Sequence, residues 1–271
     1  MTENQYYEQE ATASEFLEWY KTQDIKKYEK PSVTIDNVIF AFDKKENQLK
    51  LLLIKRAAHP FKDKYALPGG FINPNEDAKE AAKRETFEET NVKIESENQM
   101  WQIGAFSTPF RDPRGWTITI AHTTFLYPFV DPKAGDDASA CEWVSIIPAE
   151  NKKQLPYFMT QDKKIIHLDQ DLAFDHAQII KTTFKRIKSS LTFNADVAKV
   201  LGPTFTSNQL KKLFFYFDPK FNETYNPSNI VTTYVKRLEI FQKVGQITIN
   251  EQSSGRPKTL FSFNPEQENN V

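Results

Sequence analysis

The sequence predicts a mixed α+β domain followed by a winged helix-turn-helix domain, and three observations lead to this fold class. Segments with the alternation of β-strands lie on both sides of one acidic helical segment between residues 31 and 148. Amphipathic helical segments take over after residue 168, and two strand-like segments follow them. Three helices and a hairpin, in that order, are typical of a winged helix.

Composition narrows the class of protein without indicating a partner. The chain has 271 residues, 39% of them hydrophobic, and a formal net charge of -1, which gives no overall attraction to nucleic acid or to anionic membranes. Residues 169–264 contain 13 Lys or Arg and 8 Asp or Glu, a local excess of five positive charges. A single cysteine, Cys141, excludes an internal disulfide. With no signal peptide and no long apolar run, we predict a cytoplasmic protein without a membrane partner.

The elements predicted before residue 160 surround one acidic helix. We assign residues 1–30 to an N-terminal helical segment, with a helix at 12–24 that begins with a capping box of Thr12 and Glu15. Residues 31–160 form the α+β domain, and the polar, lysine-rich residues 149–168 are the expected linker. The helix of this domain runs from 77 to 90, with Asn91 just past its end. Its strands are expected at 32–42, 49–56, 101–110, 116–130 and 141–147.

Residues 168–264 carry the pattern of the winged helix. A broad apolar stripe covers residues 172–191, and a second helix begins after Thr206 as its N-cap. The third helix has Asn226 as N-cap and Pro227 at its first position, and it is expected to run to about Phe241. Two strands within residues 243–264 form the wing, and residues 265–271 are predicted to be a disordered tail.

Three glutamates of the helix at 77–90 are the strongest chemical signal. Glu85, Glu88 and Glu89 share one helix face, where their charges repel. A hard divalent cation relieves that repulsion, and Mg²⁺ is the natural candidate, with Mn²⁺ as the alternative. The metal would polarise a diphosphate and acidify a bound water, while one glutamate served as the base. The competing interpretation is a solvated acidic face, because charge runs usually lie on the surface.

The spacing around these glutamates resembles the Nudix box. The chain has Gly70, five residues, Glu76, seven residues, Arg84-Glu85, two residues, and Glu88-Glu89. It departs from the family at Thr86, where an aliphatic residue is usual, and at Asn91, where glycine is usual. Asn91 tolerates the left-handed conformation of such a cap, and we expect Thr86 only to loosen packing slightly. The resemblance implies an α+β Nudix fold, a mixed sheet sandwiched by helices. It also implies Glu85 and Glu89 as main metal ligands, assisted by Glu88 and the carbonyl of Gly69.

Segments outside the box resemble one subgroup of the family, over roughly residues 31–263. They are residues 54–71, the loop 110–116 (FRDPRGW), 136–138 (DDA) and 172–176 (LAFDH). The subgroup fuses a MutT-like, ADP-ribose pyrophosphatase-like Nudix domain to a DNA-binding domain, and some members regulate transcription in NAD or sugar metabolism. The resemblance implies a nucleoside-diphosphate-linked small molecule as ligand.

Arginines are the candidate contacts for the phosphates and ribose of such a ligand, because a guanidinium pairs two phosphate oxygens at once. We expect Arg56, Arg111 and Arg114 in this role, with Asp112 orienting Arg111 and Arg114. For Arg56, a surface cation at a strand end is the equal alternative. Gly70 and Arg84 complete the predicted substrate-binding set, and His176 is interpreted as a structural residue held by hydrogen bonds.

The third C-terminal helix is the candidate for reading DNA. Asn and Arg recognise base edges, whereas Lys, Ser and Thr often contact phosphates. The alternative is a module for protein interaction or dimerisation, since an excess of five charges is modest. The predicted DNA-binding residues are Ser228, Asn229, Thr232, Thr233, Lys236 and Arg237 on the helix, with Arg256 and Lys258 in the wing.

The sequence is compatible with two functions. The complete carboxylate set favours a Mg²⁺-dependent hydrolase of ADP-ribose or a similar nucleoside diphosphate derivative. The fused winged helix favours a transcriptional regulator whose Nudix pocket only senses that ligand, acting as a homodimer on double-stranded DNA.

Overall fold

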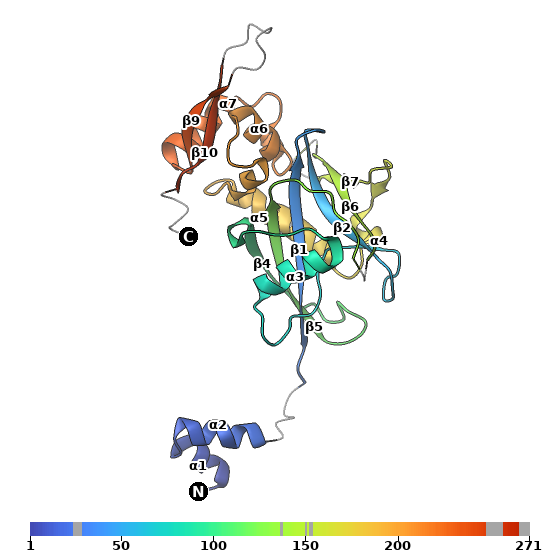
Figure 1. Ribbon diagram of the computed structural model, residues 1–271, viewed down its shortest axis with the longest axis vertical. Coiled ribbons are helices and arrows are strands. Elements are labelled where there is room, and N and C mark those ends of the chain that lie inside the picture. The colour runs from blue at the N-terminus through green and yellow to red at the C-terminus, as the bar shows by residue number, and fades with distance from the viewer. Residues whose placement is uncertain (24–28, 136–137, 150, 152–153, 248–256, 266–271) are drawn as a thin grey trace. The chain divides into compact units, whose positions relative to one another are not determined.

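A computed structural model gives the fold and describes residues 1–23, 29–135, 138–149, 151, 154–247 and 257–265 (Figure 1). The chain divides into two compact units, residues 1–31 and 32–271. No helix among these residues is long and apolar enough to cross a membrane. Three predictions fall wholly or partly outside the described residues: the acidic pair of the DDA segment, the wing residue Arg256, and the tail after Pro265.

The first unit consists of two short helices, α1 (Glu3–Gln9) and α2 (Ala13–Thr22). The predicted capping box of Thr12 and Glu15 at the start of α2 is confirmed, whereas α1 was not predicted. Tyr7 of α1 stacks on Trp19 of α2, with 4.8 Å between the ring centroids. Neither helix contains a buried residue, so this pair has little interior of its own.

A mixed sheet organises the second unit. Strand β1 (Ser32–Asp43) pairs antiparallel with β2 (Gln48–Arg56) and parallel with β5 (Thr117–Leu126). The strand order is β4-β5-β1-β2-β6-β7-β8, and β3 pairs with β2. The remaining strands are β3 (Tyr65–Ala66), β4 (Met100–Phe106), β6 (Ala138–Ile147), β7 (Tyr157–Met159) and β8 (Ile165–Ile166).

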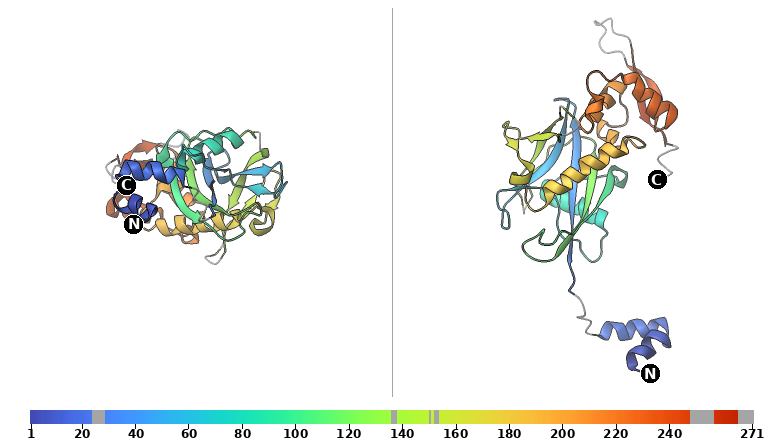
Figure 2. Two further views of the ribbon diagram at one scale, coloured as in Figure 1. Left: turned by 90° about the horizontal axis from the view of Figure 1, so that it is seen from below. Right: turned by 180° about the vertical axis from the view of Figure 1, so that it is seen from behind.

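The alternation of β1 directs its side chains to two helices on opposite faces of the sheet. Even-numbered residues such as Phe40 join the core cluster that contains Phe184 of α5 (His176–Ser190). The odd-numbered Ile35 instead packs with Ala81 and its neighbours on α3 (Ala78–Thr90). Figure 1 shows α3 in front of the sheet, and the view from behind in Figure 2 brings α5 forward. One strand therefore supplies residues to both layers.

The prediction of a linker at 149–168 was wrong in part. Strands β7 and β8 lie there and extend the sheet beyond β6. Phe158 and Ile166 are buried in the main core, and the Phe158 ring lies 5.9 Å from that of Phe184. These strands are two and three residues long and are surrounded by lysines, so the sequence shows no alternation there. The short helix α4 (Leu168–Asp171) leads into α5.

The C-terminal region contains helices and a two-stranded hairpin. The predicted N-caps Thr206 and Asn226 are confirmed, and Pro227 occupies the first turn of α7. The third helix ends at Arg237, before the predicted Phe241, because Glu239 has a left-handed φ of 55° and β9 follows. The elements are a 3₁₀ helix (Asp196–Leu201), α6 (Ser207–Phe215), a 3₁₀ turn (Pro219–Phe221), α7 (Pro227–Ile230) continued by a π-helix (Val231–Arg237), and the antiparallel strands β9 (Phe241–Ile247) and β10 (Lys258–Phe263).

Candidate functional site

The acidic helix α3 is fixed at both ends by its own sequence. Asp77 caps its N-terminus by accepting the backbone N–H groups of Lys79 and Glu80, and Glu80 reaches back to complete the capping box. At its C-terminus Asn91 is left-handed with a φ of 55°, which confirms the prediction that asparagine adopts the cap conformation for which glycine is usual. The helix thus holds its glutamates in a defined frame.

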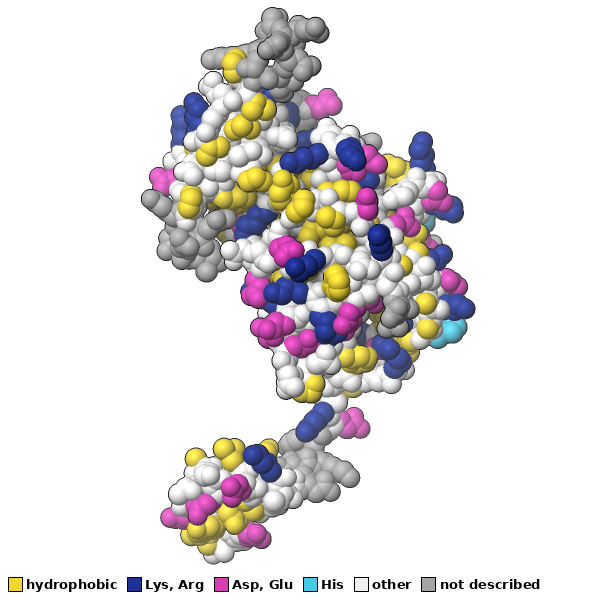
Figure 3. All heavy atoms as spheres, viewed as in Figure 1, with side chains coloured by type: hydrophobic (Ala, Val, Ile, Leu, Met, Phe, Trp, Pro, Cys, Tyr) yellow, Lys and Arg dark blue, Asp and Glu magenta, His cyan; other side chains and the backbone are white. Residues whose placement is uncertain are grey.

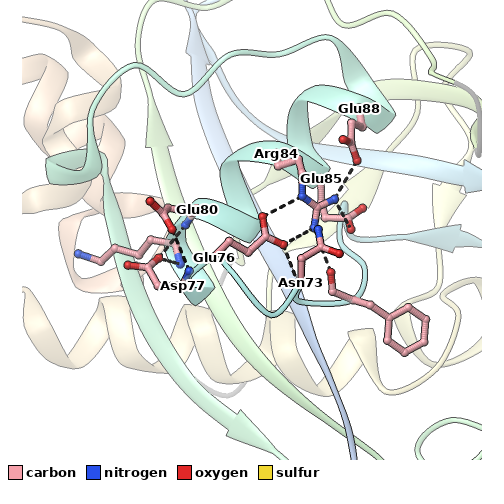
Figure 4. Close-up of polar contacts among 9 residues, drawn as sticks. Asn73, Glu76, Asp77, Glu80, Arg84, Glu85 and Glu88 are labelled. Atoms are coloured by element: carbon pink, nitrogen blue, oxygen red, sulfur yellow. Dashed lines mark hydrogen bonds and ion pairs between the residues drawn. The ribbon is translucent and has the colours of Figure 1, made fainter.

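Arg84 lies among the carboxylates of Glu76, which precedes α3, and of Glu85 and Glu88 on the helix (Figure 4). Its Nε and Nη2 donate to both oxygens of Glu76 at 2.9 and 2.6 Å, and Nη2 also donates to the carbonyl of Phe71. Its Nη1 donates to Glu85 at 2.8 Å and to Glu88 at 2.9 Å. Arg84 holds the pKa of Glu76 at about 2. The arginine predicted to contact substrate therefore donates to three glutamates of its own domain.

The three glutamates among the four predicted metal ligands occupy different environments. Glu89 is buried, and its Oε2 accepts the Gly69 N–H at 2.9 Å. The Glu85 side chain is 15% exposed, whereas that of Glu88 is 55% exposed. Burial, together with the negative charges of Glu88 and Glu76, raises the pKa of Glu85 above its ordinary value despite the pairing with Arg84. Within the described part of the chain, no three His, Cys, Asp or Glu side chains converge as a metal site, but these oxygen donors fit a hard cation.

The segment that contains Gly69 and Gly70 runs alongside strand β1 and contacts Glu85 and Glu89 of α3. The N–H of Ile35 donates to the Gly70 carbonyl at 2.8 Å, and the N–H of Asn37 donates to Pro68 at 2.9 Å. A β-carbon on Gly69 would lie 2.1 Å from the Ile35 carbonyl oxygen, and one on Gly70 would lie 2.4 Å from the Glu85 carboxylate. Gly69 requires glycine because the backbone of β1 approaches this closely, whereas at Gly70 the close contact is the end of the flexible Glu85 side chain.

A pocket opens beside Gly69 and Gly70 and brings most of the predicted substrate-binding residues together. It is lined by the predicted Arg56, Gly70, Arg111, Asp112 and Arg114, with Gly69 among its neighbours. It is also lined by residues that were given no ligand role from the sequence: Asp36, Phe71, Phe174 and His176.

Arg111 is buried in a chain of charged groups inside this pocket. Its Nη2 donates to Asp175 at 2.6 Å and to Asp36 at 3.1 Å, and its Nε donates to Asp175 at 3.0 Å. His176 accepts the Leu67 N–H at Nδ1, so its Nε2 carries the proton that Asp36 accepts at 3.1 Å. The hydrogen bonds predicted for His176 are therefore present, and its ring also lines the pocket. Burial raises the pKa of Asp36, but His176 and Arg111 outweigh it and hold that pKa at about 2.

Arg114 and Arg56 frame the pocket together with aromatic rings. Asp112 binds Arg114 through two oxygens and is not hydrogen-bonded to Arg111, so it orients one of the two arginines. The Arg114 guanidinium lies 5.7 Å from the Phe71 ring and 5.8 Å from the Phe174 ring. Arg56 donates to the Pro60 carbonyl and lies 5.0 Å from Phe174. Cations and flat faces therefore alternate around Phe174, which has a left-handed φ of 52°.

Sequence reasoning missed Asp36 and Phe174, which line the pocket, and Asp175, which pairs with the lining residue Arg111. Asp36 is an isolated acid in an apolar strand, and an ionisable residue in such a place needs a buried partner, which was an available signal. Asp175 and Phe174 precede α5, whose helical pattern led to its assignment to the C-terminal domain. In the structure α5 covers the sheet, so its start reaches the pocket.

Thr86 belongs to a buried polar network rather than to loose packing. Its Oγ1 accepts from the Asn37 side-chain amide at 3.2 Å, and Asn37 accepts the Thr124 hydroxyl at 2.9 Å. All three residues are fully buried. The expectation that Thr86 loosens the packing was therefore wrong, because the Asn37 side chain donates a hydrogen bond to the hydroxyl that replaces the usual aliphatic group.

Restoring an aliphatic side chain at this position is expected to destabilise the protein. Thr86→Val leaves the Asn37 amide without its acceptor, which should lower the free energy of unfolding by about 1–2 kcal/mol in urea titrations. Thr183→Val is the matched control, since the Thr183 hydroxyl donates to the carbonyl of Ile179 in its own helix. Equal losses in the two variants would contradict the assigned network.

The predicted DNA-binding residues lie on one helix and at the start of β10. Ser228, Asn229, Thr232, Lys236, Arg237 and Lys258 are exposed, and Thr233 is half-buried. Ile230 and Tyr234 on the same helix are buried. The polar positions thus face outward while the apolar ones anchor the helix.

Comparisons with known proteins agree with this architecture. The model of the NUDIX domain family matches residues 30–168. The chain is 28% identical to an ADPR responsive transcriptional repressor NtrR of Acinetobacter baylyi, over 92% of this chain and 87% of that protein. It is 38% identical to an ADP-ribose pyrophosphatase of Methanocaldococcus jannaschii, over 59% of this chain and 79% of the relative.

Two solved structures extend the likeness beyond the sheet. A MutT/nudix family protein from Enterococcus faecalis is 33% identical, with a TM-score of 0.77 over 97% of each chain. Shewanella oneidensis NrtR complexed with a 27mer DNA has a TM-score of 0.61 over 88% of this chain and 95% of that one. At 22% identity the second likeness concerns the fold alone. The family match covers the same residues that form the mixed sheet and the glutamate-bearing helix on one of its faces. The chain therefore belongs to the Nudix family.

Proposed function

We propose that this protein is a transcriptional regulator whose Nudix domain senses ADP-ribose or a related nucleoside diphosphate. Its C-terminal residues act as a winged helix that binds double-stranded DNA, and the protein works as a homodimer. The observation that carries the proposal is the helix at 227–237, which exposes Asn229, Lys236 and Arg237 and lies outside the residues 30–168 that match the Nudix family. The alignment with a repressor over 92% of the chain supports the same assignment.

The pocket beside Gly69 and Gly70 supports the ligand half of the proposal. Arg111 and Arg114 supply guanidinium groups for a diphosphate, and the Phe71 and Phe174 rings offer flat faces for a base. The relatives named for ADP-ribose support the choice of this ligand. Arg56 at the same pocket is a further candidate contact.

The surface charge supports a local rather than a global interaction with DNA. Figure 3 shows basic and acidic side chains interspersed over the visible face of residues 32–271. DNA affinity must then come from a small set of groups, and Ser228, Thr232, Thr233 and Lys258 would add backbone contacts around Asn229 and Arg237.

DNA binding is expected to depend on Arg237. Arg237→Ala should weaken binding of a labelled operator duplex about tenfold or more, because a guanidinium contact to a base or phosphate is lost. Fluorescence anisotropy at several salt concentrations measures both the affinity and its salt slope. Lys93→Ala, which removes an exposed lysine of the Nudix domain, is the control. Unchanged affinity in Arg237→Ala would exclude this helix as the recognition helix.

Hydrolysis of the sensed ligand is a second candidate function, favoured by the retention of Glu85, Glu88 and Glu89. These residues would hold Mg²⁺ or Mn²⁺ together with the Gly69 carbonyl. A bound metal would supply charge neutralisation of the diphosphate and a more acidic water. The protein's own residues would position the ligand through Arg111 and Arg114 and keep the carboxylates in place through Arg84.

Turnover of ADP-ribose is expected to require Glu89. With Mg²⁺ present, Glu89→Gln should reduce release of AMP by about 100-fold or more, because a carboxylate ligand or base is lost. Calorimetry should still detect ADP-ribose binding to the variant. If the wild-type protein binds ADP-ribose but turns over no member of a panel of nucleoside diphosphates, the hydrolase candidate fails and the sensor remains.

A further inference from the structure

Helix α5 begins in the ligand pocket. Asp175, its N-cap residue, accepts two hydrogen bonds from Arg111, and His176 at its first position donates to Asp36 while accepting from Leu67. The pairing of Arg111 with Asp175 is the more accessible of its two ion pairs. The Asp175 side chain is 18% exposed, compared with 9% for Asp36. An anionic ligand that enters the pocket therefore meets Asp175 as its competitor for Arg111.

The body of α5 is packed tightly against the sheet and the C-terminal region. Ile179, Ile180, Phe184 and Ile187 are 0–3% exposed. The Phe184 ring lies 5.5 Å from Phe40 of β1 and 5.1 Å from Phe217, which follows α6. Close-packed side chains transmit a displacement instead of absorbing it, so α5 is expected to shift as one rigid element.

The other end of α5 contacts the candidate recognition helix. Leu191, which follows the helix, accepts the hydroxyl of Tyr234 through its backbone carbonyl. Tyr234 is 2% exposed and lies in the π-helical turn Val231–Arg237, with its ring 5.2 Å from that of Phe214. Lys236 and Arg237 follow on the exposed side of the same turn. The two ends of one helix thus contact the ligand pocket and the helix proposed to read DNA.

We propose that α5 couples the two sites, with Asp175 as its input and Tyr234 as its output. The inference rests on the proposed function and adds the route of regulation. A diphosphate that pairs with Arg111 displaces Asp175, α5 adjusts at its N-terminus, and Leu191 carries the adjustment to Tyr234. Ligand binding and DNA binding then bias one two-state element, which is the physical requirement for allostery.

Hydrogen exchange of the full-length protein tests the output end. Addition of ADP-ribose is expected to change amide exchange in residues 227–237 by about fivefold or more in the wild-type protein. Tyr234→Phe should bind ADP-ribose within about twofold of wild type, because it lies outside the pocket, but lose most of this exchange response. Tyr225→Phe, the same change at a half-buried residue just before the helix, is the control and should respond like wild type.

The input end has a signature that a purely structural role would not produce. Asp175→Asn frees Arg111 from its competitor, so it should tighten ADP-ribose binding about threefold or more in calorimetry. Weaker binding would overturn the competition step. An unchanged exchange pattern in ligand-bound wild type, or an undiminished response in Tyr234→Phe, would overturn the route. If the wild-type protein gives no heat with ADP-ribose, the proposed ligand itself fails, which distinguishes the two failures.

Discussion

Replacement of Asp36 by asparagine is expected to lower the free energy of unfolding by about 3–5 kcal/mol, the usual cost of breaking a buried ion pair. Two donors, from Arg111 and His176, arrive at the two oxygens of Asp36. Asparagine offers one acceptor oxygen, so its own N–H groups would face a donor. Chemical denaturation at neutral pH measures the loss.

The pH dependence of this loss follows from the depressed pKa of Asp36. That pKa is about 2 in the folded protein, compared with about 4 for an unfolded aspartate. Its ionised form therefore contributes stability above about pH 4, and the contribution disappears as the pH falls from about 4 to 2. The difference between wild type and Asp36→Asn should be constant from pH 5 to 7 and shrink below pH 4. Asp112→Asn, which affects the half-exposed Arg114, should cost much less.

Gly69→Ala is expected to have the second large effect, a loss of at least about 3 kcal/mol or a failure to fold. The new β-carbon would lie 2.1 Å from the backbone carbonyl of Ile35 and 3.0 Å from the Cα of Asp36. Neither atom can move without displacing β1 from the centre of the sheet. Thermal melting followed by circular dichroism measures the change.

Gly70→Ala provides the comparison for this prediction. Its β-carbon would meet the Glu85 carboxylate, which is the end of a flexible side chain that can rotate away. We expect a smaller loss of stability, about 1 kcal/mol, with the main consequence at Glu85. Equal losses for the two variants would show that the contact between Gly69 and the β1 backbone is not what limits stability here.

The sequence predicted the elements whose signal is local. The capping boxes and N-caps at Thr12, Thr206 and Asn226 were read correctly, because each depends on residues within one turn. Strands β7 and β8 were missed because they are too short to alternate and are stabilised by pairing with β6. The third helix ends early, at Arg237, because Glu239 has a left-handed backbone. Glutamate does not favour that conformation, so the sequence did not predict the end of the helix.

The candidate site was predictable where one motif holds its residues and not where the fold brings them together. The glutamates of α3 were found from their spacing. The roles of Arg84 and Arg111 were not, because each donates to partners chosen by three-dimensional proximity. Asp36 and Asp175 are 139 residues apart in the sequence and meet only through Arg111. No periodicity or composition carries that information.

The helices α3 and α5 pack on opposite faces of the sheet, and each holds a different set of candidate site residues. The glutamates stand on α3, where Arg84 pairs with Glu85 and Glu88, whereas the arginine pocket is held from α5 through Asp175 and His176. Under the proposed functions, a substitution among the glutamates of α3 would therefore leave the packing of α5 around Arg111 in place. Hydrolysis and ligand sensing could then change independently on one shared sheet.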